Sequence, residues 1–263
     1  MRTLYIVAGV HPYPGQSLDE LQTQSVYLQT ELIFRIALVE GCTGLCSDRV
    51  GAESAVEYNW LLEKLTVDDE ERSKLLRIIR KYEQELDPTG NEEILINKLV
   101  SLRKFGVPIV HLPTEEHFDY VRFLQGKIPN GEWEQLHAQQ QQIKTEAEED
   151  EFHVRLYEEQ NRAEILMTER DHRIYNNVLH HGHQHNILHV GKEHKLLDFQ
   201  EREHDFTVYR ADVLEEYVPE KIVVTGKLPQ RLEETIVDLH DFPLVRPFDN
   251  RIDYEENMEQ IVQ

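Results

Sequence analysis

The sequence predicts an α/β fold in which helices flank a mainly parallel central sheet. Short, continuous apolar runs rich in β-branched residues recur along the chain, and Leu4–Val10 is the first of them. Such runs are typical of strands that are buried on both faces. Stretches with helical periodicity separate the runs, which is the alternation expected of βαβ units. Because 40% of the 263 residues are hydrophobic, we expect a single domain over residues 1–263 with a substantial core.

The N-terminal part of the chain predicts one βαβ unit. Leu4–Val10 and Ile33–Val39 are apolar runs with polar or glycine boundaries, and each is predicted to be a buried strand. The segment between them is predicted to be a helix that starts near Ser17, because Ser17 and Glu20 have the spacing of a capping box. The crossover between the two parallel strands is expected to be right-handed.

Two helices and a third strand are predicted in the middle of the chain. The first helix covers Thr66–Leu86 and ends at the turn Asp87–Gly90. The second helix covers Glu92–Phe105 and is closed by Gly106, since glycine readily adopts the left-handed conformation of a helix C-terminus. Val107–Val110 follows as the third strand.

A long polar segment follows the third strand. Asn130–His180 has a helical pattern, and both one long helix and two antiparallel helices fit it, because its middle lacks start and stop signals. We expect residues 115–180 to form a helical insertion that projects from the domain and mediates contacts in a homo-oligomer.

The C-terminal part of the chain predicts two further strands. Ile187–Val190 is expected to be the fourth strand and Lys221–Thr225 the fifth, with a less regular segment at Thr207–Ala211 between them. Residues 243–263 are acidic and include prolines, so we expect a loosely packed tail.

The charge of the chain excludes several classes of partner. The chain has 28 Lys and Arg residues against 50 Asp and Glu residues, which gives a formal charge of -22. A surface of this sign repels phosphate backbones and anionic lipids, so we expect neither nucleic acid nor a membrane as a partner. No apolar run approaches the roughly 18 residues of a transmembrane helix, and we expect a cytoplasmic protein. Cys42 and Cys46 are the only cysteines, and we assign them no chemistry.

Three of the apolar runs lead into a His or a Glu. Leu4–Val10 is followed by His11, the second run by Glu40, and the fourth strand by a glycine turn and His194. Because the carboxyl ends of parallel strands meet at one edge of a sheet, we expect these three side chains to converge on one polar site.

The region before the fourth strand carries two more polar features. Glu169 and Arg173 lie one turn apart on the helix, with Arg170 between them, and this spacing also fits a surface salt-bridge ladder. The segment from His180 to His185 contains four histidines, but it lacks the spacing of a zinc motif. We therefore expect only adventitious metal binding there, in a solvent-exposed loop.

Four short motifs contain these residues: Ala8-Gly9-Val10-His11, Val39-Glu40-Gly41, Glu169-Arg170-Asp171 with Arg173, and Gly191-Lys192-Glu193-His194. Together they resemble the TraB and Tiki families of the erythromycin-esterase and ChaN-like superfamily. The Phe105–Ile109 segment also resembles the middle strand of that family. The first motif departs from the family pattern, because Ala8 stands where the family has glycine. The resemblance leaves most of Ala52–Leu102 and Pro113–Asn161 unaccounted for.

The resemblance implies a hydrolase that activates water to cleave an amide or ester bond in a small-molecule or peptide substrate. In the Tiki-like case, His11, Glu40 and His194 would bind a divalent metal such as Zn, Mn or Co, which lowers the pKa of a bound water. In the erythromycin-esterase-like case no metal is needed. One His oriented by Glu40 would then act as the general base, and Arg170 or Arg173 would stabilise the oxyanion, with Glu169 supporting the site.

Two non-catalytic functions remain open at this point. In the first, the protein binds a small ligand or a metal at the same strand tips and assembles through its long polar helices; the resemblance to the haem-associated ChaN-like branch is consistent with it. In the second, the protein is purely structural and its histidines are solvated. Fold class alone does not decide between these functions.

Overall fold

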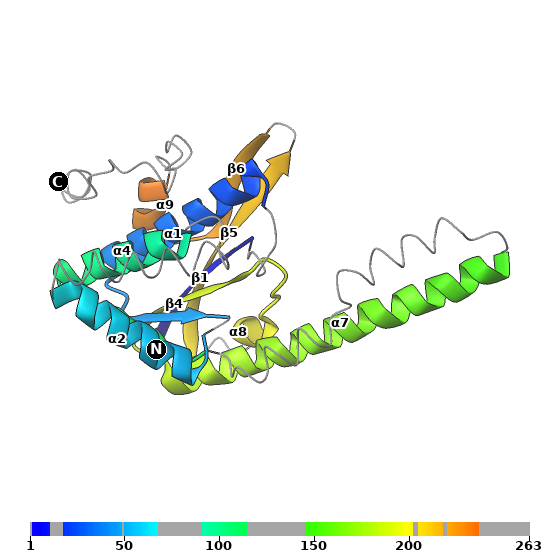
Figure 1. Ribbon diagram of the computed structural model, residues 1–263, viewed down its shortest axis with the longest axis horizontal. Coiled ribbons are helices and arrows are strands. Elements are labelled where there is room, and N and C mark those ends of the chain that lie inside the picture. The colour runs from blue at the N-terminus through cyan, green and yellow to red at the C-terminus, as the bar shows by residue number, and fades with distance from the viewer. Residues whose placement is uncertain are drawn as a thin grey trace.

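The computed structural model describes residues 2–10, 18–48, 50–67, 91–114, 146–201, 205–217 and 220–236. Its fold class is α/β, as the sequence predicts. A six-stranded, mostly parallel sheet lies between helices (Figure 1). None of the helices in these ranges is long and apolar enough to cross a membrane.

The sheet has the strand order β3-β2-β4-β1-β5-β6. The first five strands are parallel to their neighbours, and β6 pairs with β5 in the antiparallel direction. The core strands β1 and β4 are buried along most of their length, which explains the apolar run Leu4–Ala8 of β1, whereas β4 also buries the polar side chains of Asn186 and His189. The strands are β1 Arg2–Gly9, β2 Gly44–Ser47, β3 Val110–Leu112, β4 His185–Gly191, β5 Phe206–Tyr217 and β6 Glu220–Lys227.

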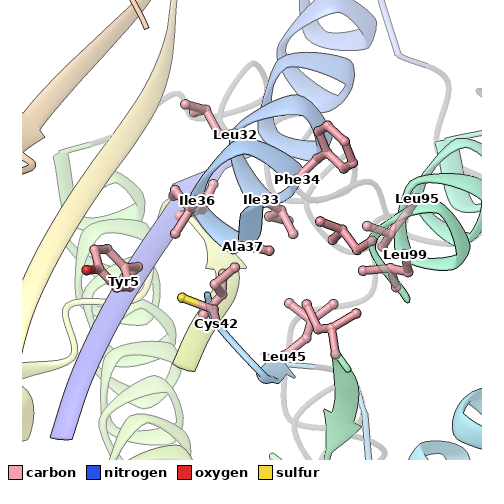
Figure 2. Close-up of a cluster of buried hydrophobic side chains, with 14 of the residues drawn as sticks. Tyr5, Leu32, Ile33, Phe34, Ile36, Ala37, Cys42, Leu45, Leu95 and Leu99 are labelled. Carbon is pink, nitrogen blue, oxygen red and sulfur yellow. The ribbon is translucent and has the colours of Figure 1, made fainter. Parts of the chain in front are cut away.

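Three helices cover one face of the sheet. They are α1 Glu20–Glu40, α2 Ala52–Val67 and α4 Asn91–Lys104. Their apolar side chains form one buried cluster with residues of the sheet. Figure 2 shows Ile33 and Ala37 of α1 gathered with Leu45 of β2 and Leu99 of α4. The short helix α9 Gln230–Ile236 also contacts α1.

The opposite face is covered by α7 Glu146–His181 and α8 Leu197–Glu201. Ile174, Tyr175 and Val178 of α7 pack with Phe199 of α8 and with apolar side chains of the sheet. The sequence left one long helix and two antiparallel helices open, and in the described residues the segment is one helix of 36 residues. Its C-terminal part lies against the sheet, and its N-terminal part extends away from the other described elements (Figure 1).

The predicted strand Ile33–Val39 is wrong, because these residues belong to α1. Every residue from Thr30 to Ala37 is buried, since α1 packs against the sheet, α4 and α9. Burial on all sides removes the helical periodicity, and even the charged pair Glu31 and Arg35 is buried, with 2.9 Å between the two side chains. The actual second strand, β2, begins after the left-handed C-cap Gly41.

The start of α1 also differs from the sequence prediction. The helix is capped by Asp19, whose side chain accepts a hydrogen bond from the Gln22 N–H at 2.8 Å, while the Gln22 side chain accepts one from the Asp19 N–H. This reciprocal pair is a capping box, in which Gln serves as well as Glu. Ser17, the predicted cap, lies outside the described residues.

Most other predicted elements are confirmed with shifted bounds. Helix α4 ends before Gly106, whose φ of +86° is the predicted left-handed cap conformation. The third strand, predicted at Val107–Val110, is β3 at Val110–Leu112, so the two ranges share only Val110. The fourth and fifth predicted strands correspond to β4 and β6. The segment predicted as less regular, Thr207–Ala211, belongs to β5, a strand of 12 residues.

Several predictions fall where the structure gives no description. Of the predicted helix Thr66–Leu86, only Thr66 and Val67 are described, and they end α2, a helix that the sequence analysis did not predict. The turn Asp87–Gly90, residues 115–145 of the predicted insertion and the tail 243–263 lie outside the described residues.

The topology singles out the carboxyl ends of β1 and β4. These strands are neighbours, yet the helices that follow them, α1 and α8, lie on opposite faces of the sheet. Such a point is a topological switch point, where open α/β sheets place their ligand sites. The two ends are joined by a hydrogen bond from the Lys192 N–H to the Gly9 carbonyl at 2.8 Å.

Candidate functional site

A buried cluster of charged side chains lies at the carboxyl edge of the sheet, beside the switch point. Asp48 directly follows β2, His194 follows β4, and Asp171 comes from α7. The ring of His194 lies between the two carboxylates. Its Nδ1 hydrogen-bonds to Asp171, and its Nε2 lies 3.1 Å from Asp48 Oδ2. Only 2% of His194 is exposed.

Local backbone structure holds His194 in this position. The His194 N–H donates to the Gly191 carbonyl at 3.1 Å, which closes a tight turn after β4. Asp171 Oδ2 accepts a hydrogen bond from the Leu196 N–H at 2.8 Å. Leu196 has a φ of +53°, a conformation that side-chain-bearing residues rarely adopt. Asp171 therefore fixes both the ring of His194 and the backbone that follows it.

Two arginines surround the cluster. Arg170 donates to the Asp48 carbonyl at 2.7 Å and lies 3.7 Å from the Asp48 carboxylate, which compensates part of the buried negative charge. Arg210 donates to the His194 carbonyl at 3.3 Å and pairs with Asp212. The cluster is therefore a network of two carboxylates, one imidazole and one guanidinium, with Arg210 holding its backbone.

The electrostatics of the cluster favour the protonated form of His194. Burial by itself lowers the pKa of a histidine, but the hydrogen bonds and charges of Asp171 and Asp48 outweigh it and raise the pKa of His194 to about 9. At neutral pH the ring is an imidazolium that donates a hydrogen bond to a carboxylate at each nitrogen. His194 is therefore a charged ring held between two carboxylate acceptors.

A single divalent metal does not fit this cluster. The two carboxylates contact different ring nitrogens, so a cation bound to one nitrogen is separated from the other carboxylate by the ring. Within the described ranges, no group of three His, Cys, Asp or Glu side chains is arranged to hold a metal ion, and this includes the His180 to His185 segment.

The structure separates the residues that the sequence analysis placed at one site. His11 lies outside the described residues. Glu40 ends α1 at the amino edge of the sheet, four residues before the start of β2, whereas His194 follows the carboxyl end of β4. Among the predicted partners that the structure describes, Arg170 alone reaches the His194 cluster. On the same helix, Glu169 is exposed and Arg173 is partly buried.

Glu40 has a structural environment of its own. Its carboxylate accepts a hydrogen bond from the Tyr5 hydroxyl at 2.6 Å and forms a bidentate ion pair with Arg231. These contacts connect α1, β1 and α9. The side chain of Glu40 is 1% exposed, and its two oxygens are occupied by these partners.

Replacing Glu40 with alanine is expected to lower the free energy of unfolding by about 1–3 kcal/mol, because the hydroxyl of the buried Tyr5 then loses its acceptor. Urea denaturation measures this change. The expected midpoint falls, while the pH titration of His194 measured by NMR stays unchanged. A displaced His194 titration would instead couple Glu40 to the carboxyl-edge cluster.

Sequence reasoning missed Asp48 and Asp171 as site residues. Asp48 follows Leu45-Cys46-Ser47, so the strand-tip rule would have found it if the second strand had been placed at β2. Asp171 lies inside the quoted Glu169-Arg170-Asp171 motif, but spacing does not show which of its side chains faces the sheet. Burial raises the pKa of the Cys42 and Cys46 thiols to about 12.

The fold and the cluster together define an α/β protein with a mostly parallel sheet and a buried His and Asp network at the carboxyl ends of its strands. Comparison of the chain with protein-family models, with curated proteins and with solved structures finds no match. The function is therefore argued from the geometry of this network.

Proposed function

We propose that the protein is a hydrolase that activates water at the carboxyl-edge cluster to cleave an ester or amide bond of a small molecule or peptide. The observation that carries the proposal is the buried His194 held between Asp48 and Asp171 beside the switch point. The resemblance to the TraB and Tiki families supports it, because two of the resembling motifs contribute Asp171 and His194 to the cluster.

In the proposed reaction, Asp48 and His194 exchange protons with the reactants. The Asp48 carboxylate accepts a proton from the attacking water, whose oxygen forms a bond to the carbonyl carbon of the substrate. The resulting oxyanion collapses and the bond to the leaving group breaks, while His194 Nε2 donates a proton to that group. Asp48 then returns its proton to His194 Nε2 along their existing hydrogen bond, which restores both groups.

The remaining members of the cluster position these two groups. Asp171 holds Nδ1 of His194 in the donor state and thereby directs Nε2 towards Asp48. Arg170 holds the Asp48 backbone and contributes positive charge near the carbon under attack. A raised pKa keeps His194 protonated at neutral pH, as a general acid requires.

Replacing His194 with glutamine is expected to lower the rate of hydrolysis by about 100-fold or more, because the general acid is lost. Aryl esters and chromogenic peptide amides of increasing acyl size serve as substrates. Asp48→Asn should lower the rate similarly. His172→Gln is the matched control, because His172 is an exposed histidine that also contacts an aspartate, Asp198, at 3.0 Å.

Absence of hydrolysis of every substrate by the wild-type protein would overturn the proposal, as would full activity in His194→Gln. Metal dependence is tested in the same assay by treatment with a chelator and by addition of Zn, Mn or Co. Activity that requires one of these metals would replace the proposed proton exchange with the metal-assisted reaction that the sequence resemblance implies.

The deep burial of the cluster favours a second candidate function. With His194 and Asp48 each 2% exposed, the network is also suited to a protein that binds a ligand without reacting with it, or that assembles with other copies. The extended N-terminal part of α7 would then supply the contacts, and Val154 and Ile165 are exposed apolar residues on it. A concentration-dependent dimer in sedimentation equilibrium, together with no hydrolysis, would support this function.

A further inference from the structure

We propose that Gln29 is a positioning residue of the carboxyl-edge cluster, and that its side-chain amide ties α1 to the ends of β1 and β4 and thereby holds Asp48 and His194 in place. The effect of Gln29 on catalysis rests on the proposed function. The positioning of the cluster by Gln29 rests only on contacts between α1 and the strands.

Gln29 lies on the sheet-facing side of α1 and is 1% exposed. Its Nε2 donates to the Val10 carbonyl at 3.1 Å, directly after β1. Its Oε1 lies 2.9 Å from Nε2 of His189, a residue of β4. One amide therefore bridges the two neighbouring strands whose ends form the switch point.

The partners of Gln29 fix the orientation of its amide. A carbonyl oxygen accepts hydrogen bonds only, so the NH2 group of Gln29 must face Val10. Its Oε1 then faces His189 and requires a donor there, which places a proton on His189 Nε2. The bridge therefore also determines the protonation of one nitrogen of His189.

Gly9 makes room for this bridge. A Cβ atom at Gly9 would lie 2.4 Å from both Cδ and Nε2 of Gln29, and all three nearest atoms belong to the Gln29 side chain. A side chain at position 9 therefore requires the amide of Gln29 to move away from the position in which it bridges the strands. The glycine of the first sequence motif is explained by this close approach.

Both strand ends that Gln29 joins lead directly to the cluster. The carbonyl of His189 accepts a hydrogen bond from the Asp48 N–H at 3.2 Å. The carbonyl of Gly9 accepts one from Lys192, in the turn that ends at His194. The first bond holds the backbone of Asp48 itself, and the second holds Lys192, two residues before His194.

A purely apolar packing role does not explain Gln29. The neighbouring sheet-facing residues of α1, Leu32, Ile33 and Ile36, are apolar. A buried amide among them destabilises the fold unless it is hydrogen-bonded, so leucine would be the expected residue for packing alone. The two hydrogen bonds to the strand ends account for the glutamine.

The test is a double-mutant cycle of Gln29→Ala and Gly9→Ala, read out by NMR titration of the histidine side chains. In each single variant the titration midpoint of His194 is expected to move towards 6.5 by at least about 0.5 pH units, because the contact with Asp48 loosens. In the double variant Gly9→Ala should add no further shift, since the truncated side chain at position 29 leaves space for the new Cβ. Gln24→Ala, on the same helix, is the matched control and should not move the midpoint.

Kinetics give a second measurement that a merely structural role would not reproduce. If the wild-type protein hydrolyses a substrate, Gln29→Ala should lower kcat by about 10- to 100-fold and leave KM within about threefold. An unshifted His194 titration in both single variants, or additive shifts in the double variant, would overturn the positioning role. A non-hydrolysing protein whose His194 titration still shifts in both variants would overturn the proposed function alone.

Discussion

Replacing Asp171 with alanine is expected to lower the free energy of unfolding by about 3–5 kcal/mol, the largest effect of any single substitution considered for this fold. The change removes one of the two carboxylates that compensate a buried imidazolium. It also removes the acceptor of the Leu196 N–H, in a backbone segment with a positive φ. Chemical denaturation at pH 7 measures the loss.

Two further variants separate the causes of this loss. Asp171→Asn keeps an acceptor for Leu196 but removes the charge, so it should fall between the wild type and Asp171→Ala. Asp198→Ala removes a carboxylate that pairs with the exposed His172, and it should cost about 1 kcal/mol or less. Equal losses for Asp171→Ala and Asp198→Ala would show that the buried network contributes no more than a surface pair.

The stability of the protein is expected to decrease on the alkaline side of pH 6.5 because of His194. Its pKa is raised to about 9 in the folded protein and is about 6.5 in the unfolded chain. The folded state therefore binds the proton more tightly, and this contribution is complete below pH 6.5 and lost as the pH rises through 9. A shift of this size corresponds to about 3 kcal/mol.

Stability is expected to decrease on the acid side as well, because of a second buried histidine with the opposite shift. His111 stacks on Tyr58, and within the described part of the chain neither of its ring nitrogens has a hydrogen-bond partner. Burial, assisted by the charge of Arg103, lowers the pKa of His111 to about 4. Between pH 6.5 and 4 the unfolded chain binds the proton and the folded protein does not, so acid favours unfolding.

Urea denaturation from pH 5 to pH 9 measures both sides of this profile. His194→Gln should flatten the alkaline side and His111→Phe the acid side, and each variant should leave the other slope unchanged. The slopes are compared, not the absolute stabilities, because each substitution also changes packing. A wild-type profile that is flat between pH 6.5 and 9 would show that His194 gains no proton affinity on folding.

The fold class could be predicted from the sequence because β1 and β4 are buried on both faces over most of their length and contain the apolar runs Leu4–Ala8 and Ile187–Leu188. The same rule failed at Ile33–Val39, where a helix is buried on all sides and loses its periodicity. Length would have been the better guide, since the whole helix covers 21 residues, from Glu20 to Glu40, and exceeds an ordinary strand. The edge strand β6 could be located from the sequence, but its antiparallel pairing with β5 could not. Most side chains of β5 are only partly buried, so β5 was not recognised as a regular strand.

The candidate site could be predicted only in part. His194 and Arg170 were found, because a strand end and a motif marked them. Asp48 was missed through the misplaced second strand, and Gln29 and His189 were missed because no local pattern shows that two residues so far apart in sequence contact each other. Glu40 was assigned to the site because a helix end was interpreted as a strand end. The errors at Asp48 and Glu40 follow from one wrong assignment of secondary structure, the strand predicted at Ile33–Val39.

The position of β4 in the sheet determines the order in which this chain can fold during synthesis. Among the described strands, β1 pairs only with β4 and β5. Thr3 of β1 is the register partner of His185 of β4, which is synthesised much later. Until the ribosome has released that segment, an apolar strand with two open edges has no native partner. A nascent chain of this kind is prone to aggregation. Fragments that end before β4 should therefore depend on chaperones, even though they contain most of the residues of the domain.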